Sequence, residues 1–423
     1  MMAKLKKLNL HSLFTAAVLT MFSSHIFSAP MSSDYASTPP AISASSSTKP
    51  LAMLVMSNDH QLSYKAYNDW SDLDGDGIIE SSYKHSFDYY GYFDSYKCYQ
   101  YDIVNKRFNP KTITSDKYCT GASISYWSGN FLNWVSMTRM DIMRKVLFGG
   151  KRSTDTTSLT VLERSYLPSD AHSFAKFVDA SSIAIGDLTP FTAGQDLTFC
   201  NTSYDSDSTK ESHTSTAPPL LRVAKGDFRY WAANERWQCT WDTEEGDNWN
   251  NNVGTNVPAS AAGNDPDIGT DDASYSGIGP DFEVKVEVCN STLIGKERCK
   301  EYTSSAGTVT VSKPIGLLHT HGENENIKFG LLTGSYKKNK SGGVVRKDIS
   351  LFTNELLTDG TTDNDFTGQF DTSVNGIVSS INKMRISKYE YDNGYYNDSD
   401  NCSWGLTSFS DGNCANWGNP ASE

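Results

Sequence analysis

The order of apolar and polar residues along the chain predicts several short strands and two helices. The continuous apolar run Leu51–Met56 is typical of a buried strand. Strict alternation over Phe282–Val288 predicts a half-buried strand. Apolar residues at helical spacing over Ser128–Leu147, followed by Gly149-Gly150, predict one long helix. Further strands are expected at 159–162, 181–185 and 327–332, and a short amphipathic helix at 377–386.

These elements predict an α/β or α+β fold. We expect a mixed sheet with flanking helices and long, disulfide-braced loops. Asn, Asp, Ser, Gly and Thr dominate much of the middle of the chain, which is typical of surface loops. We therefore divide the sequence into an N-terminal segment with the main helix (51–200), a loop-rich insertion (201–280) and the second half of the α/β region (281–423).

The first 29 residues predict an export signal. Lys4, Lys6 and Lys7 precede the apolar stretch Leu13–Phe27, and Ser28-Ala29 offers small residues for cleavage. The apolar stretch is too short to span a bilayer, so we expect no membrane-spanning segment. Residues 30–50, rich in Ser and Pro, predict a flexible linker.

Charge and cysteine content fit an exported protein. The formal net charge is −13, and loss of the three leader lysines would make it −16 (−13 minus 3), which excludes nucleic acid as an expected partner. Eight cysteines fall into neighbouring couples, which suggests disulfides in an exported chain. The sequential pairs expected are Cys98–Cys119, Cys200–Cys239, Cys289–Cys299 and Cys402–Cys414.

The segment Asp72–Glu80 indicates a specific chemistry. Aspartates occupy positions one, three and five of a tight loop, and Gly77 supplies the sharp turn that follows. Such loops bind hard cations, above all Ca²⁺, through oxygen atoms. Ile79 is expected to anchor the loop in the core. The predicted metal ligands are Asp72, Asp74, Asp76, Ile78 through its carbonyl oxygen, and Glu80.

The match to a helical calcium loop is incomplete. Position twelve, where that loop has a bidentate glutamate, is Tyr83. The following Tyr83–Tyr89 alternates like a strand, so we predict a shorter, non-helical calcium loop of the extracellular type, with a dissociation constant on the order of 0.1–1 mM. The alternative is a turn rich in Asp and Gly that binds nothing.

Other patterns carry less chemistry. The aromatic stretch 83–101 predicts a pair of strands with an aromatic core face, a sugar- or protein-binding surface being the alternative. His319 and His321 would lie on one face of a strand, as ordinary surface histidines or as metal ligands. No nucleophile or phosphate-binding motif is present, and we expect no enzyme. A local basic cluster is expected to be a solvated helix face, with docking as the alternative: Arg139, Arg144, Lys145, Lys151 and Arg152.

A series of short segments extends along nearly all of residues 51–423. In chain order they are Tyr67–Asp69 running into Asp72–Gly77, Tyr89–Cys98, Trp127–Trp134, Arg152–Asp155, Asn234–Cys239, Lys328–Tyr336 and Trp417–Pro420. Together these segments resemble the PilC/PilY family of type IV pilus tip-associated adhesin and biogenesis proteins.

The resemblance implies a large exported protein that helps pili assemble and mediates adhesion. In some members the N-terminal half contains a von Willebrand factor A-like module, and a C-terminal β-propeller carries a regulatory calcium loop. Here Met56–His60 stands where such a module has its Asp-x-Ser-x-Ser metal motif, so at most a degenerate A-like arrangement is expected. No propeller is expected within these residues either, so the Asp72–Glu80 loop is not expected to be that regulatory loop.

The leading hypothesis is an exported, non-enzymatic protein that acts in type IV pilus biogenesis and surface adhesion, with a calcium-stabilised loop. Its expected partners are pilus subunits or minor pilins, and its expected location is the pilus tip, the cell surface or the outer membrane. One alternative is a secreted, calcium-dependent carbohydrate-binding protein or hydrolase, which would need two carboxylates in an aromatic cleft. The other is a truncated, inactive copy.

Overall fold

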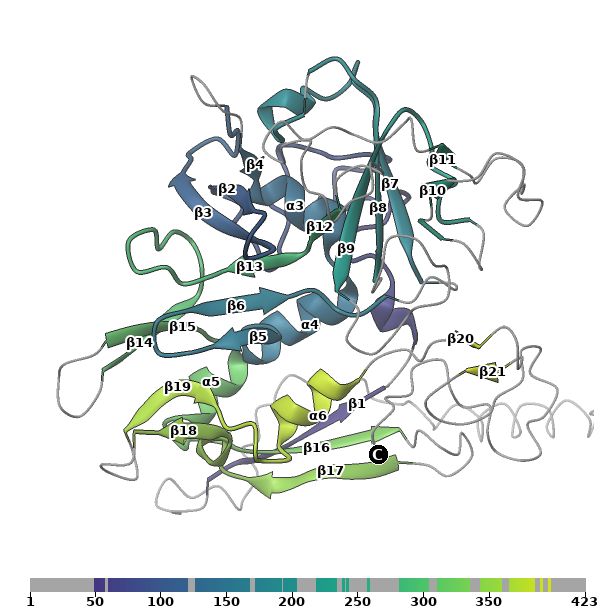
Figure 1. Cartoon of the computed structure of the whole chain (residues 1–423). Helices are drawn as coiled ribbons and strands as arrows, with labels where there is room; N and C mark the ends of the chain where they lie inside the picture. The colour runs from purple at the N-terminus through teal and green to yellow at the C-terminus, as the bar shows by residue number, and fades with distance from the viewer. Residues whose placement is uncertain are drawn as a thin grey trace, which may run out of the picture. The chain divides into compact units, whose positions relative to one another are not determined.

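The structure is a computed structural model, and its ribbon is drawn in Figure 1. The predicted signal peptide, almost all of the linker and the predicted Cys402–Cys414 pair lie outside the residues that it describes. These are residues 49–57, 60–120, 126–167, 172–191, 193–203, 218–233, 238–239, 241–242, 257–258, 281–303, 310–334, 343–359, 365–384, 389–390 and 395–396.

The fold is mixed α/β, as predicted, and its strands form several separate sheets. The largest sheet has six strands in the order β4-β2-β3-β13-β6-β5. All of its neighbouring pairs are antiparallel except β13 with β3. The strands are β4 (Trp127–Ser128), β2 (Lys97–Asp102), β3 (Arg107–Ile113), β13 (Lys285–Glu287), β6 (Thr160–Glu163) and β5 (Arg152–Asp155).

A four-stranded antiparallel sheet follows the order β12-β9-β8-β7. Its strands are β12 (Asp281–Glu283), β9 (Pro219–Lys225), β8 (Leu197–Ser203) and β7 (Phe174–Val178). The alternating run predicted as one strand over Phe282–Val288 is therefore two strands, β12 and β13, in two different sheets. The predicted alternation holds across the break, because Phe282, Val284, Val286 and Val288 are all buried.

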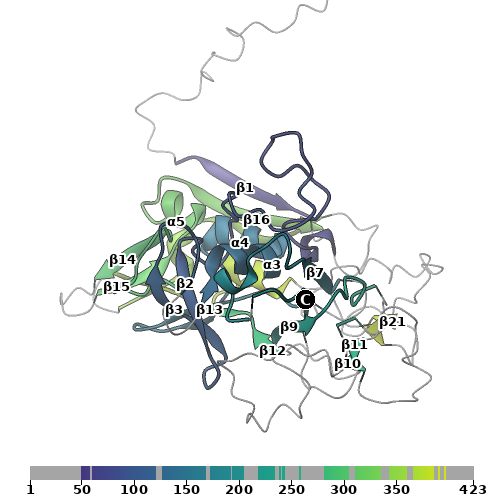
Figure 2. The ribbon, with the colours of Figure 1, turned by 90° about the horizontal axis from the view of Figure 1, so that it is seen from above.

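A three-stranded sheet consists of β1 (Leu51–Met56), β16 (Lys328–Gly334) and β17 (Gly343–Ser350). β1 lies beside β16 in parallel, as Figure 2 also shows. The strand predicted over Leu51–Met56 is confirmed, but the prediction that it is buried holds for one face only. Ala52, Leu54 and Met56 pack against the core. The residues between them face solvent, because only one face of β1 is covered.

The remaining strands form two-stranded sheets, in which only the first pair is parallel. These pairs are β10 (Trp241–Asp242) with β11 (Val257–Pro258), β14 (Cys299–Thr303) with β15 (Thr310–Pro314), β18 (Leu356–Thr358) with β19 (Phe366–Phe370), and β20 (Tyr389–Glu390) with β21 (Tyr395–Tyr396).

The single helix predicted over 128–147 is in fact two helices, α3 (Gly129–Ser136) and α4 (Arg139–Phe148). The break comes from a capping box at Thr138. The Thr138 side chain accepts a hydrogen bond from the Asp141 amide at 3.3 Å, and the Asp141 carboxylate accepts one from the Thr138 amide at 3.0 Å. Gly149 ends α4 in the left-handed conformation, as predicted.

The break directs the two helices into different cores. Every residue of α3 is buried, and its aromatic side chains join the largest core cluster. α4 contributes Met140 and Phe148 to a second core, which lies under the three-stranded sheet. Two further helices contribute to this second core, α5 (Leu317–Gly322) and α6 (Ile377–Lys383); α6 is slightly shorter than predicted.

The aromatic stretch 83–101 forms core rather than an open binding surface, as favoured from the sequence. Only β2 within it is a strand, and the predicted strand over Tyr83–Tyr89 is wrong. The backbone there bonds to side-chain amides of α3 instead of a neighbouring strand. Asn130 accepts from the Tyr89 amide at 2.9 Å and donates to the Phe87 carbonyl at 2.9 Å. Asn133 likewise donates to the Tyr89 carbonyl at 2.8 Å.

The predicted strand at 181–185 is also wrong. Asp179 starts a turn there, and its carboxylate accepts a hydrogen bond from the Ser181 amide at 2.7 Å. The chain then enters the short 3₁₀ helix η2 (Ile185–Asp187). Two other short 3₁₀ helices occur among the described residues, η1 (His60–Ser63) and η4 (Phe352–Glu355).

The basic cluster predicted as a solvated helix face is mostly internal, so that interpretation is wrong. Arg144 is 2% exposed and donates to backbone carbonyls at the end of α6. Arg152 bonds to Asp155 at 2.9 Å and to the Gly368 carbonyl at 2.7 Å. Only Arg139 of the cluster has an exposed side chain. These cations join segments that are far apart in the sequence.

Three of the four predicted disulfides are confirmed: Cys98–Cys119, Cys200–Cys239 and Cys289–Cys299. The second closes 39 residues and lies in a third small core with Trp231, inside the region predicted to be rich in loops. Within the described part of the chain, no helix is both long and apolar enough to cross a bilayer.

Candidate metal site

The predicted calcium loop, Asp72–Glu80, is closed at its neck by an antiparallel bridge between Ser71 and Glu80. Gly75 and Gly77 have φ angles of 78° and 87°, in the left-handed region that glycine adopts without strain. The chain therefore turns at the two positions where the sequence supplies glycine, which includes the turn predicted at Gly77.

The Asp72 carboxylate organises the loop. Its Oδ1 accepts hydrogen bonds from the amides of Gly75 at 2.7 Å and Asp76 at 3.1 Å, and its Oδ2 accepts from Gly77 at 2.9 Å. Asp76 acts in the same way and accepts from the Ile78 amide at 2.8 Å. The loop conformation is thus set by its own side chains, with Asp72 held inward by three backbone groups.

The structure brings four of the five predicted ligands together. One carboxylate oxygen from each of Asp72, Asp74, Asp76 and Glu80 lies within 4.8 Å of the others. Ile78, the fifth, lies in the same loop, with its amide bonded to Asp76. Hard cations such as Ca²⁺ bind clusters of carboxylate and carbonyl oxygens, so this set of donors fits the predicted ion.

The predicted anchor of the loop is wrong. The Ile79 side chain is 61% exposed and does not reach the core. Leu73 packs against the aromatic core instead. Glu80 is only 6% exposed, and its Oε2 accepts a hydrogen bond from the Leu73 amide at 2.5 Å. The buried end of the loop therefore contains a polar residue, Glu80, as well as the apolar Leu73.

A residue that sequence reasoning missed, Lys84, lies among the carboxylates. Its Nζ is 2.6 Å from Asp74 Oδ2, 2.7 Å from Asp76 Oδ2 and 3.2 Å from Glu80 Oε1. Its bonds to Asp74 and Asp76 raise the pKa of the Lys84 ammonium, and the same ammonium lowers the pKa of Asp76. The cluster is thus a place where a positive charge is held. A basic residue four positions after Glu80 was the sequence signal that could have indicated it.

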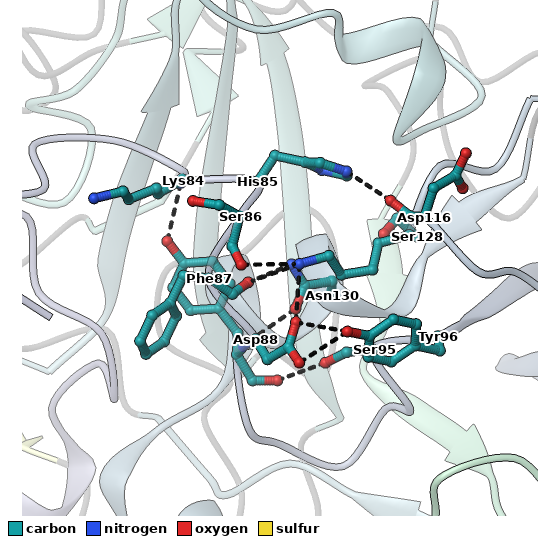
Figure 3. Close-up of polar contacts among 12 residues, drawn as sticks. Lys84, His85, Ser86, Phe87, Asp88, Ser95, Tyr96, Asp116, Ser128 and Asn130 are labelled. Carbon is teal, nitrogen blue, oxygen red and sulfur yellow. Dashed lines mark hydrogen bonds and ion pairs between the residues drawn. The ribbon is translucent and has the colours of Figure 1, made fainter. Parts of the chain in front are cut away.

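The segment that follows Lys84 is fixed to the body by polar contacts (Figure 3). The Lys84 amide donates to the Tyr89 hydroxyl at 3.0 Å. The His85 ring bonds to the Asp116 carbonyl at 2.7 Å. Asp88 accepts from the Tyr96 hydroxyl at 2.9 Å. Figure 3 shows the Lys84 side chain directed away from these contacts, so the backbone that carries it is held while its ammonium extends to the loop.

The two histidines considered as metal ligands are not on a strand, so that prediction is wrong. Both lie on helix α5. His319 is buried rather than exposed, and its Nδ1 accepts a hydrogen bond from the Gly316 amide at 3.3 Å. Burial lowers the pKa of the His319 imidazole well below its usual range. His319 therefore packs as a neutral core residue.

One further group of potential ligands lies together in the described residues: Cys289, Glu297 and Cys299. The two cysteines are bonded to each other. The Glu297 carboxylate lies 2.8 Å from the ammonium of Lys97, which is fully buried. This group is occupied by its own covalent bond and ion pair, so the Asp72–Glu80 loop remains the candidate site.

Known proteins similar to this chain are associated with type IV pili. Residues 80–224 match a family model described as a PilY1 homolog small alpha/beta domain, and residues 329–423 match one described as a PilY1 homolog second domain. A type IV pilus biogenesis factor PilY1 homolog from Xylella fastidiosa is 36% identical over 396 residues. That match covers 88% of this chain.

A second PilY1 homolog from the same organism is 34% identical over 95 residues, or 21% of this chain and 8% of its own length. The chain spans about a quarter, 24%, of the length of the first relative. No solved structure matches the chain.

Proposed function

This chain belongs to the PilY1 homolog family, and we propose that it acts outside the cytoplasm in type IV pilus biogenesis and surface adhesion. In this proposal it works by binding, with pilus subunits or minor pilins as partners, at the pilus tip or the cell surface. Catalysis has no part in it.

One observation carries the proposal: the match to a type IV pilus biogenesis factor PilY1 homolog, at 36% identity, extends over 88% of the chain. The three disulfides support the location, because such bonds persist in oxidising compartments outside the cytoplasm. The acidic composition agrees with a partner other than nucleic acid.

The test is to delete the gene in the bacterium that encodes this chain and to count surface pili by electron microscopy and by immunoblot of sheared pilin. We expect fewer pili, and recovery when the chain is supplied again. Unchanged pilus numbers and unchanged surface attachment in the deletion strain would refute the proposal.

The second part of the proposal is that Ca²⁺ stabilises the Asp72–Glu80 loop. Four converging carboxylates support it, together with an ammonium that already lies among three of them. Asp72, Asp74, Asp76 and Glu80 would hold the ion, with the Ile78 carbonyl as a fifth ligand. Because the unfolded chain does not gather these oxygens, bound calcium would stabilise the folded state.

Lys84 makes this part sharply testable, since its ammonium and Ca²⁺ would compete for the same oxygens. Calcium should raise the melting temperature of the wild type, and an Asp74→Asn/Asp76→Asn double variant should lose that rise. A Lys84→Met variant should show the rise at several-fold lower calcium. Asp371→Asn, a partly exposed turn aspartate elsewhere, is the control and should behave as the wild type does. Equal calcium responses in all four proteins would refute the site.

A further inference from the structure

The calcium-type loop and its neck expose three large apolar side chains. Trp70 is 64% exposed, Ile78 67% and Ile79 61%. These residues lie within ten positions of one another in the sequence, on one closed loop. Single exposed apolar residues are ordinary on protein surfaces, but a local group that includes a tryptophan is typical of an interaction site.

The neck of the loop brings two of these side chains near each other. Ser71 and Glu80 are paired by an antiparallel bridge. Trp70 precedes Ser71 and Ile79 precedes Glu80, so each lies next to a bridged residue. Glu80 is buried, whereas Trp70 and Ile79 are both more than half exposed. Figure 2 shows a dark purple loop of the segment between β1 and β2 projecting beyond the helices and strands next to it.

The base of this surface is held rigidly. The Trp70 amide donates to the Asn68 side chain at 3.0 Å, and the Lys65 ammonium lies 4.7 Å from the centre of the Trp70 ring. Asp69, beside Trp70, bonds to the buried Lys176 of β7 at 2.6 Å. An anchor that is already ordered loses little entropy when it binds, which favours a binding role.

The charge beside the apolar group limits what can bind there. Four carboxylates (Asp72, Asp74, Asp76 and Glu80) and the one ammonium of Lys84 give a formal charge of −3 (−4 plus 1), and the proposed Ca²⁺ would make it −1 (−3 plus 2), so the loop is acidic in either state. An anionic lipid surface would be repelled by such a loop. A protein surface with an apolar hollow edged by lysine or arginine complements both features.

We propose that Trp70, Ile78 and Ile79 form a docking surface for a protein partner that presents an apolar hollow with a basic rim. The proposal rests on the proposed function for the identity of that partner, a subunit of the assembled pilus. Three side chains are too few for a whole interface, so they act as its central anchor, with Trp70 filling the hollow.

The experiment measures co-sedimentation of the purified, oxidised chain with purified pili from the same bacterium. The test variant is Trp70→Ser/Ile79→Ser. The matched control is Leu51→Ser/Val55→Ser, which removes two equally exposed apolar side chains from β1, 65% and 73% exposed. Because all four side chains are exposed, both variants should keep the wild-type melting temperature.

We expect the test variant to bind at least about tenfold more weakly than the wild type, with the control unchanged. We also expect binding to weaken as salt rises, because the rim is charged. Equal binding by wild type and test variant overturns the docking surface, and so does an equal loss in the control.

The proposal is also overturned if the wild type binds vesicles of phosphatidylglycerol and phosphatidylcholine instead of pili. Self-association through Trp70 instead of pilus binding overturns it as well. Absence of any binding to pili overturns it too. Pilus counts in the deletion strain still decide the proposed function, so the two proposals fail separately.

Discussion

Replacing Arg144 by methionine should destabilise the connection between the two halves of the fold. This side chain starts on α4, which lies in the region matched by the first family model. Its guanidinium reaches the carboxyl end of α6, in the region matched by the second. A positive charge at the carboxyl end of a helix also complements the helix dipole. Methionine keeps the apolar stem of arginine and removes only the guanidinium.

The magnitude follows from the contacts that are lost. One terminal nitrogen of the Arg144 guanidinium, Nη2, donates to the carbonyls of Ile381 at 3.1 Å, Asn382 at 3.3 Å and Met384 at 3.1 Å. The other terminal nitrogen, Nη1, donates to Ser165 Oγ at 3.0 Å. The Ile381 carbonyl keeps a bond from the Met384 amide, and Asn382 can reach water. The buried Met384 carbonyl loses its donor, so we expect a cost of about 3 kcal/mol.

The assay is urea unfolding followed by tryptophan fluorescence, with hydrogen exchange to locate the change. Exchange should accelerate in α6 more than in α3, since α3 lies in the other core. Arg139→Met is the matched control, because Arg139 lies on the same helix with an exposed side chain. Its cost should stay within about 0.5 kcal/mol. Equal costs for the Arg144 and Arg139 variants, or uniform exchange, would refute the reasoning.

Three other outcomes are expected. Burial lowers the pKa of Lys176 to about 8, below the 10.5 of an ordinary lysine, so the unfolded chain binds more protons between these values. The free energy of unfolding should therefore rise from pH 8 to pH 10, and urea titrations should show a smaller rise in Lys176→Met. Replacing Cys200 and Cys239 by alanine should cost about 4 kcal/mol, the loop-closure value for 39 residues; a loss below about 1 kcal/mol in urea unfolding would contradict this. Gly376→Ala would place its Cβ 2.0 Å from Cδ of Glu355, which caps α6, and should cost about 1–3 kcal/mol, with calorimetry as the check.

Sequence reasoning succeeded where the signal was local. The pairing of neighbouring cysteines needed only their spacing, and three pairs are confirmed. The alternation over Phe282–Val288 correctly predicted which residues are buried, because side chains alternate with the same period in any sheet. The break before α4 was missed although its signal, Thr138 three residues before Asp141, was present in the sequence.

It failed where burial depended on distant partners. Arg144 was interpreted as part of a solvated helix face, yet its backbone carbonyl acceptors lie 237 to 240 positions away. β1 was interpreted as a buried strand because an apolar run does not show whether one or both faces of the strand are covered. Ile79 was expected in the core as the apolar anchor of a calcium loop, but Leu73 packs there and Ile79 is exposed.

By itself, the sequence determined which carboxylates the Asp72–Glu80 loop brings together, three disulfide pairs and the alternating burial over Phe282–Val288, since each depends on residue type and short-range spacing. The tertiary structure alone decided which faces are covered. It placed the Lys84 ammonium among the loop carboxylates and left Trp70 exposed beside them. The physical reason is that burial is a property of contacts between segments, and those contacts join residues separated by tens to hundreds of positions.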